Sequence, residues 1–253
     1  AFKKAAPPGH PGPAPGAPPA RVARGAPVNW TMLWDSLPYL LGGAYPDGPI
    51  GGAALIVLLS LGSGILSALL GLGLGIALAM LQGPARVVLT SALAFLRAIP
   101  VLMLIFWSYF LLPMALGINV PGVLSVMAAL SLIGGAYLAH AVFAGITGIA
   151  AGQWAAGLSL GLTRWGTLRH IVLPQSLRMM LPSFVNQWVT LVKDSTRAYI
   201  VGVGELSFVA SQVNARTMVY PAAIFMLVGL IYWVLCAGLD QVLKGVAARV
   251  RTQ

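Results

Sequence analysis

Two long stretches without charged residues constrain this chain more than any other feature. No Asp, Glu, Lys or Arg lies between Asp47 and Arg86, and between Arg97 and Arg164 the only residue among Asp, Glu, Lys, Arg and His is His140. Each stretch exceeds the roughly 20 residues that a helix needs to cross a bilayer. The sequence therefore predicts a chain that crosses a membrane several times.

The composition supports lipid as the surrounding solvent. Apolar residues make up 58% of the chain and charged residues 8%, which is too few charges to cover the surface of a soluble domain of this size. The net charge of +10 comes from cations in short loops and tails beside apolar runs, so we do not expect nucleic acid as a partner. The single cysteine, Cys236, allows no disulfide. His10 and His170 lack a second ligand at metal-binding spacing, so no metal site is expected.

The chain divides into three parts. Residues 1–28 are rich in proline, glycine and alanine and predict a disordered tail. Residues 29–49 predict a short interfacial segment, with Trp30, Trp34 and Tyr39 as aromatic anchors. Residues 50–253 form the predicted transmembrane domain.

The expected fold class is an all-α integral membrane protein with about five transmembrane helices. The expected spans cover about residues 50–81, 87–112, 120–143, 181–206 and 222–243. Glycines in the first span suit close helix packing in a bilayer; they are Gly62, Gly64, Gly71, Gly73 and Gly75. Glu205 is expected to mark the outer end of the fourth span rather than a ligand site.

Basic residues in short loops predict the orientation, because such loops stay on the cytoplasmic side. One topology places all of these residues on the cytoplasmic face: Arg86, Arg164, Arg169, Arg178, Lys244, Arg249 and Arg251. The loop around Asn119 is then outside.

The segment from about 145 to 180 is less apolar, basic and too long for a simple turn. Residues 153–160 and 163–172 predict two short helices joined at Gly161, whose backbone freedom permits a sharp turn, with Pro174 ending the second helix. Leu162, Trp165 and Leu168, beside Arg164 and Arg169, could dock on a groove of a cytoplasmic partner.

This segment resembles the cytoplasmic loop of type I ABC importer permeases, whose pattern is Glu-Ala-Ala, three residues, Gly, nine residues, then Ile, any residue, Leu, Pro. The matching positions are Ala155, Ala156, Gly157, Gly161, Ile171, Leu173 and Pro174. Ala155 replaces the leading glutamate, and Gly157 replaces the second alanine. Residues 96–113, 135–146 and 192–206 resemble the polar amino-acid branch, and the second span is most similar to glutamate/aspartate permeases.

The resemblance implies a subunit in the bacterial inner (cytoplasmic) membrane, surrounded by lipid, that is not itself an enzyme. An ABC ATPase dimer, carrying ATP and Mg, would dock on this loop, a periplasmic amino-acid-binding protein would deliver substrate, and a second permease subunit, identical or homologous, would complete the pore. No lysine of this chain follows a glycine-rich phosphate loop. We therefore expect no cofactor in this chain.

Polar residues inside the predicted spans are candidates for the substrate path. Arg97 lies within the second span, where an isolated charge costs at least roughly 2.5 kcal/mol; it could meet a substrate carboxylate, or form a structural ion pair, or snorkel. Relatives usually have a glutamate at the position of His140. Five polar residues, from Lys193 to Arg197, interrupt the fourth span and could line a cavity or form a structural hinge; the candidates for the substrate path among them are Lys193, Asp194, Ser195 and Thr196. Arg197, where relatives usually have an apolar residue, could pair with Asp194 three positions away.

Two other classes of protein must be weighed against a permease subunit. A stand-alone channel or secondary carrier for small solutes would need no coupling loop. A membrane-embedded enzyme would need paired carboxylates, a histidine cluster or a nucleophile near a base at membrane depth, and the sequence shows no such group.

Overall fold

The computed structural model describes residues 30–217 and 221–251. The predicted tail at 1–28 therefore lies outside the described residues. The ordered elements are α-helices, interrupted by short π-helical and 3₁₀ turns. They are α1 (Trp30–Gly42), α2 (Gly52–Met80), α3 (Gly83–Ala98), α4 (Val101–Phe106), a π turn (Trp107–Leu111), α5 (Leu112–Leu116), α6 (Gly122–Thr147), α7 (Ala151–Ser159), α8 (Arg164–Thr167), a second π turn (Leu168–Val172), α9 (Leu173–Asp194), a 3₁₀ turn (Ser195–Val201), α10 (Leu206–Thr217) and α11 (Pro221–Arg251).

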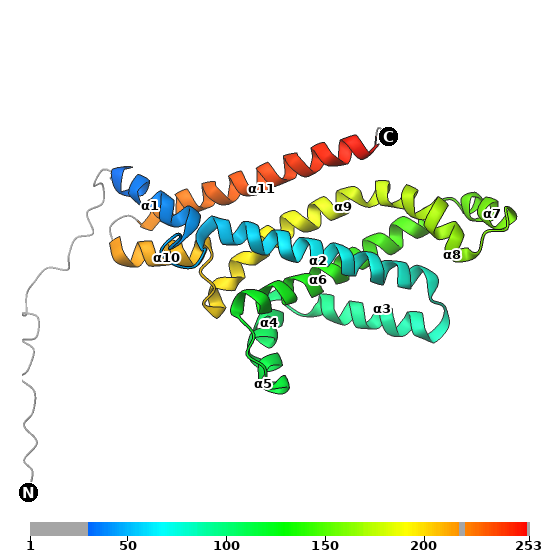
Figure 1. The fold of residues 1–253 in the computed structure, drawn as a ribbon, viewed down its shortest axis with the longest axis horizontal. Coiled ribbons are helices and arrows are strands. Elements are labelled where there is room, and N and C mark those ends of the chain that lie inside the picture. The colour runs from blue at the N-terminus through cyan, green and yellow to red at the C-terminus, as the bar shows by residue number, and fades with distance from the viewer. Residues whose placement is uncertain (1–29, 218–220, 252–253) are drawn as a thin grey trace, which may run out of the picture.

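Helices α2 and α6 pack against each other along the centre of the molecule (Figure 1). Glycines permit this approach, because a Cβ on Gly71 would lie 2.4 Å from Leu138 Cβ and one on Gly75 would lie 2.4 Å from Val142 Cβ. Ser67 adds a hydrogen bond from its hydroxyl to the Ser131 carbonyl oxygen at 3.3 Å. Small residues let helices pack closely where lipid offers no hydrophobic drive. The first and third predicted spans are thus confirmed as α2 and α6.

The second predicted span is wrong as a single continuous helix. The axes of α3 and the α4–α5 segment differ by 98°. The bend falls at Ile99 and Pro100, and Ile99 has an extended backbone with φ −73° and ψ 128°. Proline offers no backbone N–H and disfavours the helical conformation of the residue before it. The apolar composition alone did not reveal this break.

The fourth predicted span is also displaced. Helix α9 begins at Leu173, and its backbone continues from α8 through the π turn without leaving the helical conformation. Pro174 therefore does not end a helix, which corrects the prediction. Pro174 has no backbone N–H to bond the carbonyl oxygen four residues before it, and it lies just after the π turn, where the regular α-helical pattern is already interrupted. At its other end α9 stops at Asp194, where the 3₁₀ turn starts.

The predicted number of five spans is not confirmed. Within the described residues, three helices are long and apolar enough to cross a membrane, namely α2, α6 and the Pro221–Val242 part of α11, or four if the bent α3–α5 pair counts as one span. Helix α9 has 22 residues, or about 33 Å. Its polar residues make it less apolar than the helices just named, although it lies alongside α6 and α11.

The predicted basic loops gather toward one end of the molecule. The turn between α2 and α3, which leads to Arg86, lies at the same end as α7 and α8 (Figure 1). At the opposite end lie α1, α10 and the first turns of α2 and α11. We name these the coupling end and the anchor end. This arrangement agrees with the predicted single topology.

Candidate functional site

The coupling end is a compact helical head formed by α7 and α8. Gly161 turns the chain between them with φ +80°, a conformation that glycine adopts without strain. Thr163 caps α8 by accepting a hydrogen bond from the Gly166 N–H at 3.1 Å. The two helices are so close that a Cβ on Gly157 would lie 2.5 Å from Thr167 Cγ2. The predicted turn at Gly161 is confirmed, and Gly157 is explained by this close approach.

The head presents an apolar and basic surface to solvent. Leu160 is 79% exposed, Trp165 is 52% exposed, and Leu158 is half exposed. Arg164 and Arg169 are also exposed. Of the predicted coupling residues, Ala155, Ala156 and Pro174 lie on the exposed surface, while Leu162, Ile171 and Leu173 are half-buried.

Leu168 does not belong to this surface. Its exposed fraction is 0%, and it packs in a core with Val142, Ile146 and Val172. The prediction that Leu168 docks directly on a partner is wrong, because the helical phase turns it toward α6 while Trp165 stays outside. Leu168 instead fixes the head to the helix bundle.

Arg97 occupies the last turn of α3, two residues before the bend that begins at Ile99. Its guanidinium carbon lies 5.8 Å from the ring centroid of Tyr137 on α6, a cation–π contact. Its Nε atom is buried without a hydrogen-bond partner. His140 lies three residues beyond Tyr137 and its Nδ1 is 3.3 Å from the Ala136 carbonyl oxygen. Arg97 therefore contacts α6 one turn from His140, whose given contact is within α6.

The polar end of α9 combines two cations with one carboxylate. Asp194 and Arg197 form an ion pair, as their spacing predicted. Ser195 donates to the Val192 carbonyl oxygen at 2.8 Å, and Thr196 donates to that of Lys193 at 2.8 Å. Lys193 is exposed, whereas Ser195 is buried. The hydroxyls of Ser195 and Thr196 are thus bound to nearby backbone carbonyl oxygens. Any contact with a ligand would have to come from the charged side chains of this segment.

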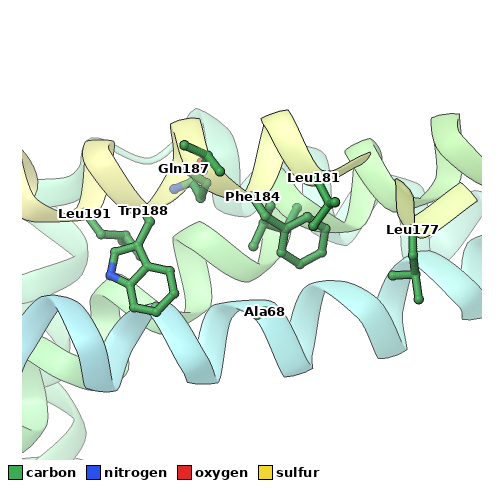
Figure 2. A pocket seen from close by; sticks show the side chains of 10 residues that line it. Ala68, Leu177, Leu181, Phe184, Gln187, Trp188 and Leu191 are labelled. Carbon is green, nitrogen blue, oxygen red and sulfur yellow. The ribbon is translucent and has the colours of Figure 1, made fainter. Parts of the chain in front are cut away.

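Two cavities lie elsewhere. One of about 210 Å³ sits between α2, α6 and α9, where Phe184 and Trp188 point from α9 toward α2 near Ala68 (Figure 2). Its lining is apolar apart from groups such as the Gln187 amide. A second cavity of about 390 Å³ lies at the anchor end, between Tyr39, Tyr109 and Gln212. None of the predicted substrate-path residues lines either cavity.

Glu205 is the residue whose importance the sequence did not reveal. Its side chain is fully buried, and its carboxylate accepts hydrogen bonds from Ser207 N–H at 2.9 Å, Phe208 N–H at 3.0 Å and the Tyr232 hydroxyl at 2.9 Å. The two backbone contacts cap the N-terminus of α10, and the third ties that cap to α11. The glycines before Glu205 hinted at a turn, but glutamate is not a preferred capping residue, and Tyr232 is distant in sequence.

The backbone beside Glu205 joins the anchor end to the start of α2. The Gly52 N–H donates to the Gly204 carbonyl oxygen at 2.9 Å. Gly52 has φ +58°, and a Cβ there would lie 2.1 Å from the Leu40 carbonyl oxygen. Tyr39 on α1 donates to Gln212 Oε1 on α10 at 2.6 Å. The segment that follows Asp194 and Arg197 is therefore held firmly at its far end.

Two solved structures share this fold. A structure titled "Crystal structure of an amino acid ABC transporter with histidines" superposes with a TM-score of 0.74, covering 88% of this chain and 100% of that chain at 22% identity. An inward-facing structure of the MetNI methionine ABC transporter gives a TM-score of 0.70 over 79% of this chain and 94% of that chain at 19% identity. The fold is that of a type I ABC importer permease.

The sequence comparisons give the family. Residues 69–252 match the family described as "Binding-protein-dependent transport system inner membrane component", and the chain belongs to it. The "Probable amino-acid ABC transporter permease protein YckA" of Bacillus subtilis (strain 168) is 33% identical, with 83% of this chain and 88% of that protein covered. GlnP of Escherichia coli (strain K12), a glutamine transport system permease protein, is 28% identical over 88% of this chain and 98% of its own length. GltK of Escherichia coli O6:H1, a glutamate/aspartate import permease protein, is 29% identical over 74% and 83%.

Proposed function

We propose that this chain is the membrane-spanning subunit of an ATP-driven importer for a polar amino acid, with glutamate and aspartate as the first substrates to test. The observation that carries the proposal is the helical head at the coupling end. Trp165 and Arg164 are exposed on it, while Gly157 and Leu168 fix it to the bundle. A surface that is apolar, basic and rigidly mounted suits a partner that must move the helices behind it.

The head would dock on an ABC ATPase dimer in the cytoplasm, and ATP and Mg would bind there rather than on this chain. A periplasmic amino-acid-binding protein would deliver substrate at the opposite face. A second permease subunit, identical or homologous, would complete the pore within the bacterial inner (cytoplasmic) membrane. Relatives named for glutamine, cystine and glutamate/aspartate transport support a polar amino acid as the class of substrate.

The substrate preference within that class rests on charge. The charged residues at the candidate substrate path and beside it are three cations, Arg97, Lys193 and Arg197, and the carboxylate of Asp194. An excess of positive charge favours the carboxylates of acidic amino acids over a second ammonium group. A direct measurement is binding of glutamate, aspartate, glutamine and cystine to the cognate periplasmic protein by calorimetry. Tight binding of glutamine or cystine alone would contradict the acidic preference.

Reconstituted uptake tests the mode of transport. Proteoliposomes with this chain, the ATPase and the binding protein should accumulate substrate only with ATP and Mg. A matched preparation that lacks the ATPase serves as the control. Uptake that persists in that control would favour the alternative, a stand-alone channel or secondary carrier.

A further inference from the structure

The outer face of α9 differs from the outer faces of α2 and α11. On α2 and on residues 221–238 of α11, every exposed residue is apolar, aromatic, glycine or proline. The polar side chains of α2 point inward instead, because Ser60, Ser63 and Ser67 are buried. This arrangement, apolar outside and polar inside, suits helices whose outer face meets lipid.

The middle of α9 has the reverse arrangement. Ser183, Asn186 and Thr190 are exposed, and their spacing of three and four residues places them on one side of the helix. Val185 and Leu191, on the other side, are buried. Between residues 183 and 193, each exposed residue is polar. We call Ser183, Asn186 and Thr190 the α9 stripe.

The α9 stripe lies at the depth of the membrane. Trp188, which falls within the stripe, packs so closely on α2 that a Cβ on Gly64 would lie 2.8 Å from its Cε2 atom. Gly64 is near the middle of α2, which is long and apolar enough to cross a membrane. The other neighbours of α9, α6 and α11, pass the same test. The stripe therefore lies far from both ends of these helices.

Polar groups at this depth need partners that lipid tails do not offer. The Thr190 hydroxyl donates a hydrogen bond to the Asn186 carbonyl oxygen at 2.9 Å. In the part of the chain that the structure describes, the Ser183 hydroxyl and the Asn186 amide group have no hydrogen-bond partner. Polar residues within membrane-spanning helices almost always face a protein interior or a water-filled cavity. The stripe is therefore expected to face away from lipid.

A dry contact with a second permease subunit is the alternative. Arg178 and Lys193 are exposed on α9 at either end of the stripe. The single carboxylate of this helix, that of Asp194, is already paired with Arg197. A dry contact would remove both cations from water without a partner from α9 of a second copy, at a large cost. Water between the subunits avoids that cost.

We infer that the α9 stripe lines the water-filled path by which the imported solute crosses the membrane. The inference rests on the proposed function and deepens it, because it names residues that face the moving solute. Ser183, Asn186 and Thr190 are neutral and offer hydrogen-bond donors and acceptors. They can thus replace water around both the carboxylate and the ammonium group of an amino acid.

The experiment measures the reactivity of single cysteines in the assembled transporter. The full chain carries Cys236→Ser, so each introduced cysteine is the only one in it. The complex with its ATPase partner, in lipid nanodiscs that leave both faces open, is treated with a charged, membrane-impermeant methanethiosulfonate. The mass of the permease chain is followed with and without ATP and Mg. The test variants are Ser183→Cys, Asn186→Cys and Thr190→Cys.

The matched controls are Ile65→Cys and Leu69→Cys on α2 and Met226→Cys on α11. These residues are 53%, 63% and 76% exposed in the single chain, so a difference in rate reports what covers each face in the membrane. In at least one nucleotide state the three stripe cysteines should react at least about tenfold faster than the controls, because a thiol ionises in water and stays protonated in apolar surroundings. In proteoliposomes, modification of the stripe cysteines should block ATP-dependent uptake, and modification of the controls should not.

Two results would overturn the inference. Stripe cysteines as slow as the controls would show a face covered by lipid or by dry protein, and a disulfide between two copies of the Asn186→Cys chain on oxidation would identify the second case. Fast modification that leaves uptake intact would place the stripe on a hydrated crevice apart from the path. If one variant does not assemble, the other two positions make the same comparison. Uptake by the Cys236→Ser parent tests the proposed function separately: uptake with slow stripe cysteines overturns the inference alone, and no ATP-dependent uptake of any amino acid overturns both.

Discussion

Helix α9 connects to the coupling end on one side and, through the 3₁₀ turn, to the anchor end on the other. The two ends are fixed by different kinds of contact. At the coupling end, α8 and α9 form one continuous helical path, and α7 is fixed to it by apolar packing and the close approach of Gly157 to Thr167. At the anchor end, a buried carboxylate, a tyrosine hydroxyl and glycine backbone contacts fix the segment that follows the 3₁₀ turn. Motion imposed on the head would therefore reach Asp194 through a helix whose far connection is fixed by polar contacts.

This contrast predicts that substitution of Glu205 causes the largest loss of stability. The Glu205→Ala variant leaves three donors without their acceptor, and we expect a loss of about 4 kcal/mol in the free energy of unfolding. Unfolding in mixed detergent micelles measures it. The matched control is Tyr232→Phe, which removes one donor, keeps the α10 cap and should cost about 1 kcal/mol. Equal losses in the two variants would show that the cap itself contributes nothing.

The next largest effect separates the core of the head from its surface. Leu168→Ala should cost about 3 kcal/mol of stability, because it opens a cavity beside α6. Trp165→Ala should change stability by less than about 0.5 kcal/mol while weakening ATPase binding about tenfold, since an exposed tryptophan is a typical interface anchor. Unfolding and pull-down titrations of both variants provide the comparison. A Leu168→Ala variant that unfolds like wild type would contradict the buried placement.

The two ends also differ in how far the sequence predicted them. The head was predictable because Gly161, the helical spacing and the basic residues are local signals, and the family pattern falls on the same positions. Leu168 was wrongly predicted to lie on the exposed surface, because the side of the helix on which it lies depends on where α8 begins after Gly161. The Thr163 cap fixes that start. Glu205 was missed because its partner Tyr232 comes from another helix. The bend at Pro100 was missed because apolarity dominated the prediction of the second span.

Gly157 tests whether the head must be rigid. Gly157→Ala adds a methyl group at 2.5 Å from Thr167 Cγ2, so α7 must shift, at a cost of about 2 kcal/mol. We expect ATP hydrolysis to continue with reduced uptake per ATP. Gly152→Ala is the matched control on the same helix, because nothing lies within 4 Å of its added Cβ. If both variants transport like wild type, tight packing of α7 is not needed for coupling.

The smallest predicted effect concerns Arg97, which belongs neither to the helical head nor to the Glu205 contacts at the anchor end. Its guanidinium rests over Tyr137, a contact worth about 0.5 to 1 kcal/mol when partly exposed. Tyr137→Leu should therefore lower stability by about that amount, and Tyr137→Phe, which keeps the ring, should not. If Arg97 also meets the substrate carboxylate, Arg97→Ala should raise the KM for glutamate uptake more than Tyr137→Leu does, because it removes the charge itself rather than the ring beneath it. Uptake kinetics for the three variants make the comparison, and an Arg97→Ala variant with an unchanged KM would restrict Arg97 to packing between α3 and α6.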